Sequence, residues 1–338
     1  LQGLRCCFLC CAWLTSEKDV QTYTDTDFAM DTVVSETLYT TGDDINSKLT
    51  AVLTDVETNL LSWTNEKSQI YKVNADSGKD TEISDELSGY LKRLLKIAED
   101  SDGAFDPTIG KLIRLWDIGG ENQKIPEEAE IKNVLKDSGY QKIFLDGNTV
   151  HMEDGCSLDF GAAGKGIGCD LILKELETKK DVTAALMNLG GSSVMTYGSK
   201  PDGSSWNVAV TDPRAENEDD YLGVVALNGT EFLSTSGDYE KYFIENGVRY
   251  HHIMDPSTGY PAESGVTGVT VVCDSGLEAD ALSTACFVLG VEKGTQLLKA
   301  YGADGLFVDE DHHVYLTKGM KERFSLLADS YSVEDIAE

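Results

Sequence analysis

The stretch of the chain that says most about its fold reads LDFGAAGKGIGCD, from Leu158 to Asp170. An apolar, strand-like run ends at Asp159, small residues follow, and Asp170 with the residues after it opens a helical pattern. Small residues let the backbone approach a ligand, and free N–H groups at a helix start attract an anion such as phosphate. Lys165 adds a positive charge to this turn. The spacing is neither that of a P-loop nor that of an early GxGxxG, so a purely structural turn is an equal alternative on this stretch alone.

Composition narrows the classes of function. The 338 residues suffice for one large domain or two, and 41% hydrophobic with 26% charged residues is typical of a soluble globular protein. The formal net charge of −31 excludes functions that need a basic surface, such as nucleic-acid binding. An anionic dinucleotide would also be repelled, so such a substrate requires a metal ion or a local cationic site.

The cysteines fall into two groups. Cys6, Cys7, Cys10 and Cys11 lie in a short apolar run after Arg5, whereas Cys156, Cys169, Cys273 and Cys286 are scattered. The run is similar to the end of a secretory signal, with cysteines where a bacterial lipoprotein is lipidated. We therefore predict that residues 1–24 are a signal-like or lipoprotein-like segment and tether, and that the protein is extracytoplasmic and membrane-anchored. The scattered cysteines are predicted to be buried small apolar residues.

The pattern of apolar residues predicts one α+β domain over residues 25–328, with a helical first third, a strand-rich mixed or antiparallel core, and a frayed acidic tail over 329–338. Helices are predicted to begin at Asp43 or Asp44, Ser84, Pro107, Pro126, Leu277 and Glu292, and hairpins to turn at Asp146-Gly147, at Asn246-Gly247 and within 305–316. Strands are predicted over 28–34, around Leu158, and over 184–189, 194–197, 207–211, 223–227, 232–234 and 266–273.

Four further segments carry residues suited to chemistry. Asp106 precedes Pro107 and is either a helix cap or a ligand contact. The pair Gly190-Gly191 ends a strand and indicates a tight turn or a close backbone approach. Asp280 and Thr284 lie four residues apart on one helical face, and with backbone carbonyls they form an all-oxygen set that suits Mg²⁺; an ordinary helix face is the alternative.

The fourth segment holds two adjacent histidines, His251 and His252, beside a Pro/Gly turn. Side chains alternate along a strand, so only one of the two can face a site. A histidine near its unperturbed pKa of about 6.5 suits proton transfer from a hydroxyl group. A surface histidine is the alternative on this segment alone.

Taken together, these segments resemble the FAD:protein FMN transferases of the ApbE family. The matching motifs occur in the family's order between residues 105 and 290: FDPTIGKLIRLWDIG, LDFGAAGKGIGCD, NLGGS, STSGDYEKYF, YHHIMDPSTGYP and EADALSTACFVLG. The resemblance covers nearly the whole chain after about residue 25.

The resemblance implies a Mg²⁺-dependent enzyme that splits FAD at its pyrophosphate, transfers FMN to a Thr or Ser hydroxyl of an acceptor protein and releases AMP. It implies metal ligation by Asp280, Thr284 and the carbonyl of Ala162, with Ser283 able to add a ligand. It implies FAD contacts at Met30, Trp63, Ala104, Phe105, Asp106, Asp159, Lys165 and Ile253. His252 would activate the acceptor hydroxyl.

The acceptor implied by the resemblance is a subunit of a redox-driven ion pump or an extracytoplasmic electron-transfer protein with a short Asp/Ser/Gly/Ala/Thr motif. Two other functions stay open: a Mg²⁺-dependent FAD pyrophosphatase that uses water, and a non-catalytic FAD-binding lipoprotein. If His252 is the base, we expect His251→Ala to be nearly neutral and the transfer rate to rise with pH around a pKa of about 6.5.

Overall fold

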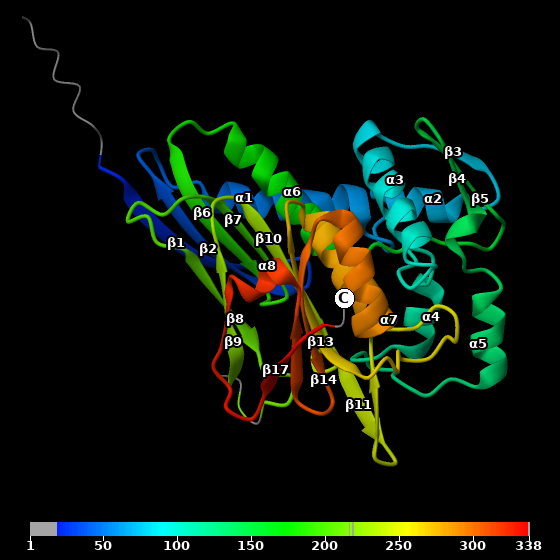
Figure 1. Ribbon diagram of the computed structural model, residues 1–338. Coiled ribbons are helices and arrows are strands. Elements are labelled where there is room, and N and C mark those ends of the chain that lie inside the picture. The colour runs from blue at the N-terminus through cyan, green and yellow to red at the C-terminus, as the bar shows by residue number, and fades with distance from the viewer. Residues whose placement is uncertain (1–18, 216, 218–219, 337–338) are drawn as a thin grey trace, which may run out of the picture.

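A mixed sheet runs through the centre of the computed structural model, which describes residues 19–215, 217 and 220–336. In this part of the chain the sheet has nine strands in the order β1-β2-β6-β7-β10-β13-β14-β15-β17 (Figure 1). Its neighbouring strands pair antiparallel except for β15 and β17, which pair parallel. The predicted α+β fold in one domain is confirmed.

The strands of the central sheet are β1 (Gln21–Ala29), β2 (Thr32–Thr40), β6 (Val182–Leu189), β7 (Ser193–Gly198), β10 (Glu231–Gly237), β13 (Val266–Cys273), β14 (Asp304–Asp309), β15 (His313–Leu316) and β17 (Ser332–Glu334). Smaller sheets pair β11 (Tyr242–Glu245) with β12 (Val248–His251), β16 (Phe324–Leu326) with β9 (Tyr221–Leu227) and β8 (Trp206–Thr211), and β3 (Asp80–Glu82) with β5 (Thr149–Met152) and β4 (Ile143–Asp146). The helices are α1 (Asn46–Val56), α2 (Gln69–Ala75), α3 (Asp85–Asp100), α4 (Gly110–Trp116), α5 (Glu128–Leu135), α6 (Gly164–Glu177), α7 (Gly276–Tyr301) and α8 (Lys318–Lys321), with short turns η1 (Glu57–Leu61) and η2 (Tyr140–Lys142).

Alternating side chains give the central sheet two apolar faces. In β13, Val271 packs among residues of α3 and α7, whereas its neighbour Val272 packs among residues of β8 and β9. Because side chains of a strand point alternately to opposite faces, one strand contributes residues to the hydrophobic core on each face of the sheet. Helices thus cover one face, and the small β16-β9-β8 sheet covers the other.

Helices α6 and α7 meet at their first turns. A Cβ atom added to Gly166 would lie 2.0 Å from the carbonyl oxygen of Gly276, and one added to Gly276 would lie 2.2 Å from the carbonyl oxygen of Gly166. The two backbones can approach this closely only because neither residue has a side chain.

The two helices also cap one another. The N–H of Gly166 donates to Oδ2 of Asp280 at 2.6 Å, and the N–H of Gly276 donates to Oδ1 of Asp170 at 2.7 Å. The first N–H groups of a helix have no partner within the helix, so each aspartate supplies an acceptor that the other helix needs. Each aspartate follows the glycine of its own helix by four residues. The N-termini of both helices are thereby held together beside Asp280.

These contacts correct two predictions about the glycine-rich segment. Helix α6 begins at Gly164 and not at Asp170, because the cap from α7 offsets the low helix propensity of the glycines. Leu158 is not in a strand, since its N–H and carbonyl bind the amide side chain of Asn74 at 2.7 and 2.8 Å in place of a neighbouring strand.

The chain ends also differ from the prediction. The expected tether is a strand from Gln21 onward. The single strand expected over 28–34 consists of the end of β1 and the start of β2, separated by a turn at Met30 and Asp31, which have φ of 53° and 56°. Near the other end, Ser332–Glu334 pairs with β15 because the adjacent Tyr331 is buried, so the expected frayed tail is wrong there. Helix α2 was not expected. The signal-like segment lies in residues 1–18, outside the described residues, together with its four cysteines.

Other local predictions are confirmed. Ser84 caps α3 by accepting the N–H of Leu87, and the predicted Asn246-Gly247 turn joins β11 to β12. The predicted hairpin of β4 and β5 is present, but its two-residue turn is Gly147-Asn148 and not Asp146-Gly147, because Asp146 pairs with Thr149. Helix α7 breaks at Gly290, where φ is 77°, between the two helices expected there. The four scattered cysteines are free thiols, and all but the partly buried Cys273 are buried.

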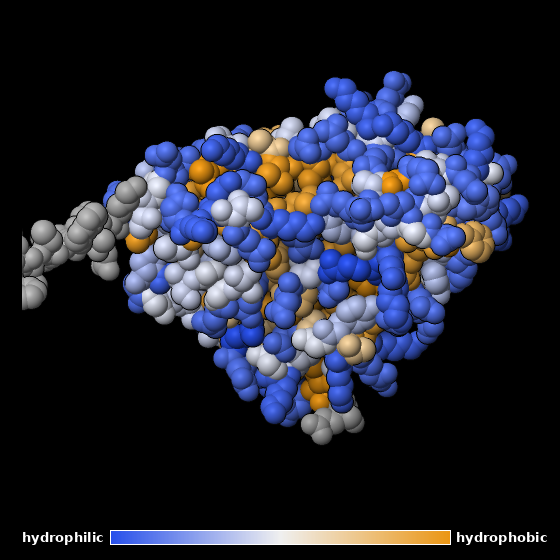
Figure 2. Space-filling view, turned by 90° about the horizontal axis from the view of Figure 1, so that it is seen from above, coloured by the Kyte–Doolittle hydropathy of each residue, from blue (hydrophilic) through white to orange (hydrophobic). Residues whose placement is uncertain are grey.

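The surface agrees with the acidic composition. Hydrophilic residues cover most of the face seen from above, and apolar residues gather in a band near its middle (Figure 2). Within the described ranges, no helix combines the length and the apolar character that a membrane span requires.

One carboxyl group of the fold is buried without a charge partner. Glu36 of β2 is 2% exposed and accepts a hydrogen bond from Thr50 at 2.9 Å through Oε1. Its Oε2 and both polar side-chain atoms of Asn46 have no partner among the described residues. Burial raises the pKa of Glu36 from its ordinary 4.5 to about 7.

We predict that Glu36→Gln stabilises the protein at alkaline pH. The folded state holds the Glu36 proton up to about pH 7 and the unfolded state releases it near 4.5, so unfolding becomes easier as pH rises between these values. The shift corresponds to about 3 kcal/mol. Urea unfolding at pH 4 and pH 8 should show a higher free energy of unfolding for the variant than for the parent only at pH 8, whereas the exposed Glu310→Gln should follow the parent. A gain of equal size at both pH values would contradict the burial of an ionisable group here.

Candidate active site

Two neighbouring cavities lie at the N-termini of α6 and α7. The first has a volume of about 310 Å³ and the second about 760 Å³. They share the residues Asp159, Gly161, Lys165, Ser192, Thr235, Glu240 and Lys241. Together they form one site with Lys165 at its middle.

The structure brings all the predicted site residues to these cavities. The first is lined by Ala104, Phe105, Asp106, Asp159, Ala162, Lys165, His252, Ile253, Asp280, Ser283 and Thr284. The second is lined by Met30 and Trp63, together with Asp159 and Lys165.

Asp280 is a buried carboxylate at the junction of α6 and α7. It is 7% exposed, and its two oxygens accept hydrogen bonds from Gly166 N–H, from Ser193 Oγ at 2.8 Å and from Ser234 Oγ. Burial raises its pKa, which the Ser234 hydrogen bond and the Lys165 ammonium oppose. A carboxylate buried beside a cavity with so little positive charge around it is a favourable place for a cation.

Hydroxyl groups extend this oxygen-rich wall. Ser283 Oγ donates to the carbonyl of Asp280 at 2.8 Å, and Ser236 Oγ lies 2.8 Å from Ser283 Oγ and 3.3 Å from Thr284 Oγ1. Ala162 lines the same cavity from the turn before α6. One carboxylate with neutral oxygens is the donor set of a hard cation such as Mg²⁺, so the residues present fit the metal that the resemblance implies.

Lys165 supplies the positive charge of the site. Its Nζ donates to Ser192 Oγ, and the residue lies in the first turn of α6. The N–H groups of that turn and the helix dipole favour an anion at the same place. The site therefore combines a cation, a helix N-terminus and a carboxylate that could hold a metal, which suits a pyrophosphate group.

Arg114 of α4 contacts both Trp63 and Asp159, two residues for which the resemblance implies contact with FAD. The sequence alone did not indicate Arg114. Its guanidinium lies 4.4 Å from the centre of the Trp63 ring, and its Nη1 lies 3.4 Å from Oδ2 of Asp159. Asp159 also accepts the N–H of Gly161 at 2.9 Å. The motif FDPTIGKLIRLWDIG contains Arg114, but only the fold shows that it lies between two loops far apart in sequence.

Asp106 is a structural acceptor as well as a wall of the cavity. Its Oδ1 accepts the N–H and the hydroxyl of Thr108 at 2.8 and 2.6 Å, and its Oδ2 accepts the N–H of Tyr140 at 3.0 Å. Both oxygens are thus used within the protein. The helix that follows begins at Gly110, so Asp106 caps the turn before α4 and not the helix itself.

His252 is the titratable base of the first cavity. Its Nδ1 lies 3.3 Å from the carbonyl oxygen of Lys241, and its own N–H donates to that carbonyl at 3.0 Å. Because a carbonyl only accepts, this contact favours the tautomer with the proton on Nδ1, which leaves Nε2 able to take a proton. Burial lowers the pKa of His252 to about 4, so the expected pKa of 6.5 is wrong.

His251 faces the core and not the solvent. It is 6% exposed, its ring centre lies 5.3 Å from that of Phe287, and its Nε2 lies 3.1 Å from the carbonyl of Ala262. Its Nδ1 accepts the N–H of Ile253 at 3.3 Å. The two histidines do face opposite sides, as expected, but the expectation that His251→Ala is neutral conflicts with this burial.

Several residues of the site lie outside the sequence prediction. Ser193 and Ser234 donate to Asp280, Ser236 lies within hydrogen-bond distance of Ser283, and Glu240 lines both cavities. Serines on adjacent strands β7 and β10 converge only through sheet pairing, which the sequence alone does not display.

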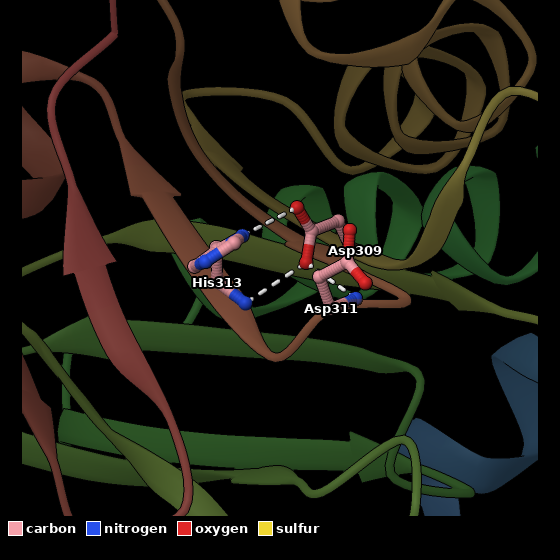
Figure 3. Close-up of side chains that lie close together, drawn as sticks. All are labelled: Asp309, Asp311 and His313. Carbon is pink, nitrogen blue, oxygen red and sulfur yellow. Dashed lines mark hydrogen bonds and ion pairs between the residues drawn. The ribbon is translucent and has the colours of Figure 1, made fainter.

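A second group of potential ligands lies at the β14–β15 turn (Figure 3). Asp309 accepts the N–H groups of Asp311 and His313 at 2.9 and 2.8 Å, and His313 Nδ1 lies 3.0 Å from its other oxygen. These contacts close the turn, and the hydrogen bond to Asp309 raises the pKa of His313. None of the three residues lines either cavity.

The structure is thus an α+β fold with two neighbouring cavities lined by a buried carboxylate, hydroxyl groups and one lysine at a helix start. A model of the ApbE family matches residues 30–307. The FAD:protein FMN transferase of Treponema pallidum (strain Nichols) is 35% identical over 292 residues, which cover 81% of this chain and 80% of that protein. The FAD:protein FMN transferase of Klebsiella pneumoniae (strain 342) is 33% identical over 284 residues, or 82% of this chain and 86% of that protein.

The fold also matches solved structures of ApbE proteins. The crystal structure of the ApbE protein from Thermotoga maritima superposes with a TM-score of 0.80 at 33% identity and covers 90% of this chain and 99% of that chain. The apo form of the flavinyl transferase ApbE from Pseudomonas stutzeri superposes with a TM-score of 0.79 at 30% identity and covers 91% and 98%. This chain belongs to the ApbE family.

We predict that His251→Ala destabilises the fold and that His252→Ala does not. Removing the His251 ring leaves a cavity beside Phe287 and unpairs the Ile253 N–H, which should cost about 2–3 kcal/mol. His252 borders a cavity already, so its removal should change the free energy of unfolding by less than about 1 kcal/mol. Urea unfolding of both variants measures this, and equal losses of stability would contradict the different placement of the rings.

Proposed function

We propose that this chain is a Mg²⁺-dependent FAD:protein FMN transferase, which moves FMN from FAD to a Thr or Ser hydroxyl of an acceptor protein and releases AMP. The observation that carries the proposal is the meeting, in one cavity, of the buried Asp280 carboxylate, Lys165 at a helix start and a neutral His252. The names of the similar proteins support the flavin chemistry.

The reaction balances with the groups of this site. The acceptor hydroxyl oxygen attacks the phosphorus of the FMN half of FAD, and the bond from that phosphorus to the bridging oxygen breaks. The bridging oxygen keeps the electron pair and leaves with AMP. His252 takes the hydroxyl proton at Nε2 because its Nδ1 faces the Lys241 carbonyl.

The residues around Asp280 position the pyrophosphate. Lys165 and the N–H groups at the start of α6 offset its charge, which a protein of net charge −31 must do locally. Asp280, Thr284, Ser283 and the carbonyl of Ala162 would hold Mg²⁺, and the metal when bound supplies charge neutralisation at phosphate oxygens.

The remaining walls suit the two ring systems of a dinucleotide. Ile109, Ile113, Ile118 and Met254 line the first cavity with apolar surface. Trp63, whose ring is stacked on Arg114 and 44% exposed, borders the second. Flat apolar groups and aromatic faces are what planar heteroaromatic rings bind against.

The test is incubation with FAD, MgCl₂ and a 20-residue peptide that carries Asp-Ser-Gly-Ala-Thr at its centre, followed by mass measurement of the intact peptide and detection of AMP. The proposal expects the peptide to gain one FMN for each AMP released. Free FMN with AMP and an unchanged peptide would indicate the pyrophosphatase, and FAD binding without AMP release would indicate the non-catalytic carrier.

The extracytoplasmic, lipid-anchored location is part of the proposal. It rests on the sequence of residues 1–24 and on the extracytoplasmic acceptors that the resemblance implies, and it makes the acceptor a protein on the same side of the membrane.

We predict that Asp280→Asn abolishes the Mg²⁺ response and that Asp170→Asn keeps it. Both aspartates cap a helix, and asparagine can accept the same N–H, but only Asp280 lines the cavity. Removing a direct ligand should lower transfer at fixed Mg²⁺ by at least about 100-fold. Transfer measured across a MgCl₂ series checks this, and a parental response in Asp280→Asn would remove the carboxylate from the metal site.

We predict that His252→Ala binds FAD like the parent and transfers FMN about 10²–10⁴-fold more slowly. The neutral ring is the working form and its pKa is about 4, so the parent rate should not change with His252 titration between about pH 5 and pH 8 and should fall as pH drops through about 4. Transfer rates across this range, with FAD affinity from flavin fluorescence, measure both. A rate that rises around pH 6.5 would contradict the lowered pKa.

A further inference from the structure

The β11–β12 hairpin projects from the body of the molecule (Figure 1). Its strands are joined by Asn246-Gly247, with φ of 52° and 79°, in a two-residue turn. At its base the N–H of His252 donates to the carbonyl of Lys241 at 3.0 Å, and both residues line the first cavity. The hairpin is thus a direct extension of the strand pair that holds the proposed base.

One face of the hairpin is fixed to the protein. The rings of Phe243 and Tyr250 stack with centres 5.2 Å apart, and Tyr250 lies 5.8 Å from Trp116 of α4. Trp116 is buried and donates to the carbonyl of Gly259 at 2.9 Å. These contacts hold the direction in which the hairpin leaves the site.

The outer edge of β11 has backbone groups without a partner strand. Hydrogen-bonded and non-hydrogen-bonded pairs alternate along antiparallel strands. Since Lys241 and His252 form a hydrogen-bonded pair, the N–H and carbonyl groups of Tyr242 and Ile244 point away from β12. In the part of the chain that the structure describes, the sheet of β11 and β12 contains no third strand.

This edge carries charges only at its two ends, at Lys241 and Glu245, while the guanidinium of Arg249 on β12 lies 3.9 Å from the centre of the Tyr242 ring. Natural proteins place charges, proline or bulges on such strands to prevent pairing with other chains. Here Tyr242 is 41% and Ile244 61% exposed, and Val248 across the turn is 49% exposed. Apolar side chains on an open edge are unexpected on a protein of net charge −31 and indicate a surface that a partner covers.

We propose that the outer edge of β11 binds an extended segment of the acceptor polypeptide as a third strand and leads its hydroxyl residue to His252. This inference rests on the proposed function, since a water-using enzyme needs no polypeptide site. Strand addition to an open edge is a general mode of peptide recognition, with affinity from main-chain hydrogen bonds.

Both strands lead to the first cavity, but among the described residues only the edge of β11 is open along that path. Glu240 and Lys241, which precede β11, line both cavities. The segment after β12 is covered by its own chain, since Ala262 N–H donates to the Ile253 carbonyl at 2.9 Å. Ile244 lies three residues from Lys241, or about 10 Å at about 3.3 Å per residue, so the reacting Thr or Ser should lie about three or four residues beyond the paired segment.

Hydrogen exchange tests the edge without any turnover. The probe is the same 20-residue peptide with valine in place of the reactive threonine. The amides of Tyr242 and Ile244 should exchange rapidly in the free protein and slow down as the peptide is added, whereas the amide of Phe243, already within the hairpin ladder, should change little. Unchanged exchange of Tyr242 and Ile244 at saturating peptide would overturn the proposal. Protection in the free protein that disappears on dilution would do so as well, because it would assign the edge to a second copy of this chain.

A proline variant tests the consequence for transfer. Ile244→Pro removes an outward N–H that the hairpin does not use, and Ile244→Ala is the matched control that keeps it. For the 20-residue peptide we expect KM to rise about tenfold in Ile244→Pro, with kcat retained and KM in Ile244→Ala closer to the parent. The five-residue peptide Asp-Ser-Gly-Ala-Thr, which is too short to pair with the edge, should react alike with all three proteins.

The outcomes separate this inference from the proposed function. A parent that transfers FMN to neither peptide contradicts the proposed function, and hydrogen exchange then decides the edge by itself. Transfer to the long peptide with equal KM in the parent and in Ile244→Pro overturns the edge while leaving the transferase in place. Equal losses with both peptides would indicate damage to the cavity and would also overturn it.

Discussion

The close contact between Gly166 and Gly276 is the constraint on which the site depends. It lets the first turns of α6 and α7 meet, and the exchange of caps between Asp170 and Asp280 then holds both N-termini in place. The two caps have different surroundings. Asp170 lies 3.7 Å from the guanidinium of Arg93, which compensates its charge away from the cavities. Asp280 faces a cavity with Lys165 nearby. Of the two capping aspartates, Asp280 is therefore the one placed to bind a cation.

The groups of the site offset the repulsion between an acidic protein and an anionic ligand. A surface of net charge −31 repels a dinucleotide with a pyrophosphate, and long-range attraction cannot bring it in. Binding has to come from short-range groups: the Lys165 ammonium, the N–H groups of a helix start, a metal held by oxygen ligands, and apolar walls for the rings. Burial of His252 lowers its pKa and keeps its ring neutral, which is the form that accepts a proton. A single cavity thus combines charge neutralisation with a base.

Sequence patterns predicted what depends on local spacing. Asp280 and Thr284 share a face because helices repeat every 3.6 residues, and His251 and His252 diverge because strands alternate. Patterns could not predict what depends on distant partners. The start of α6 depends on a cap from α7, the hydrogen bonding of the Leu158 backbone depends on Asn74, and the pKa of His252 depends on its burial. Arg114 and the serines of β7 and β10 reach the site only through the fold.

The measurement that most directly tests this account is a crystal structure of the protein soaked with Mn²⁺ as a stand-in for Mg²⁺, with anomalous scattering used to place the metal. The account predicts an anomalous peak within bonding distance of Asp280 and Thr284, at the junction of α6 and α7. A peak at Asp309, Asp311 and His313, with none beside Asp280, would contradict it, because the metal would then bind at a turn that lines neither cavity.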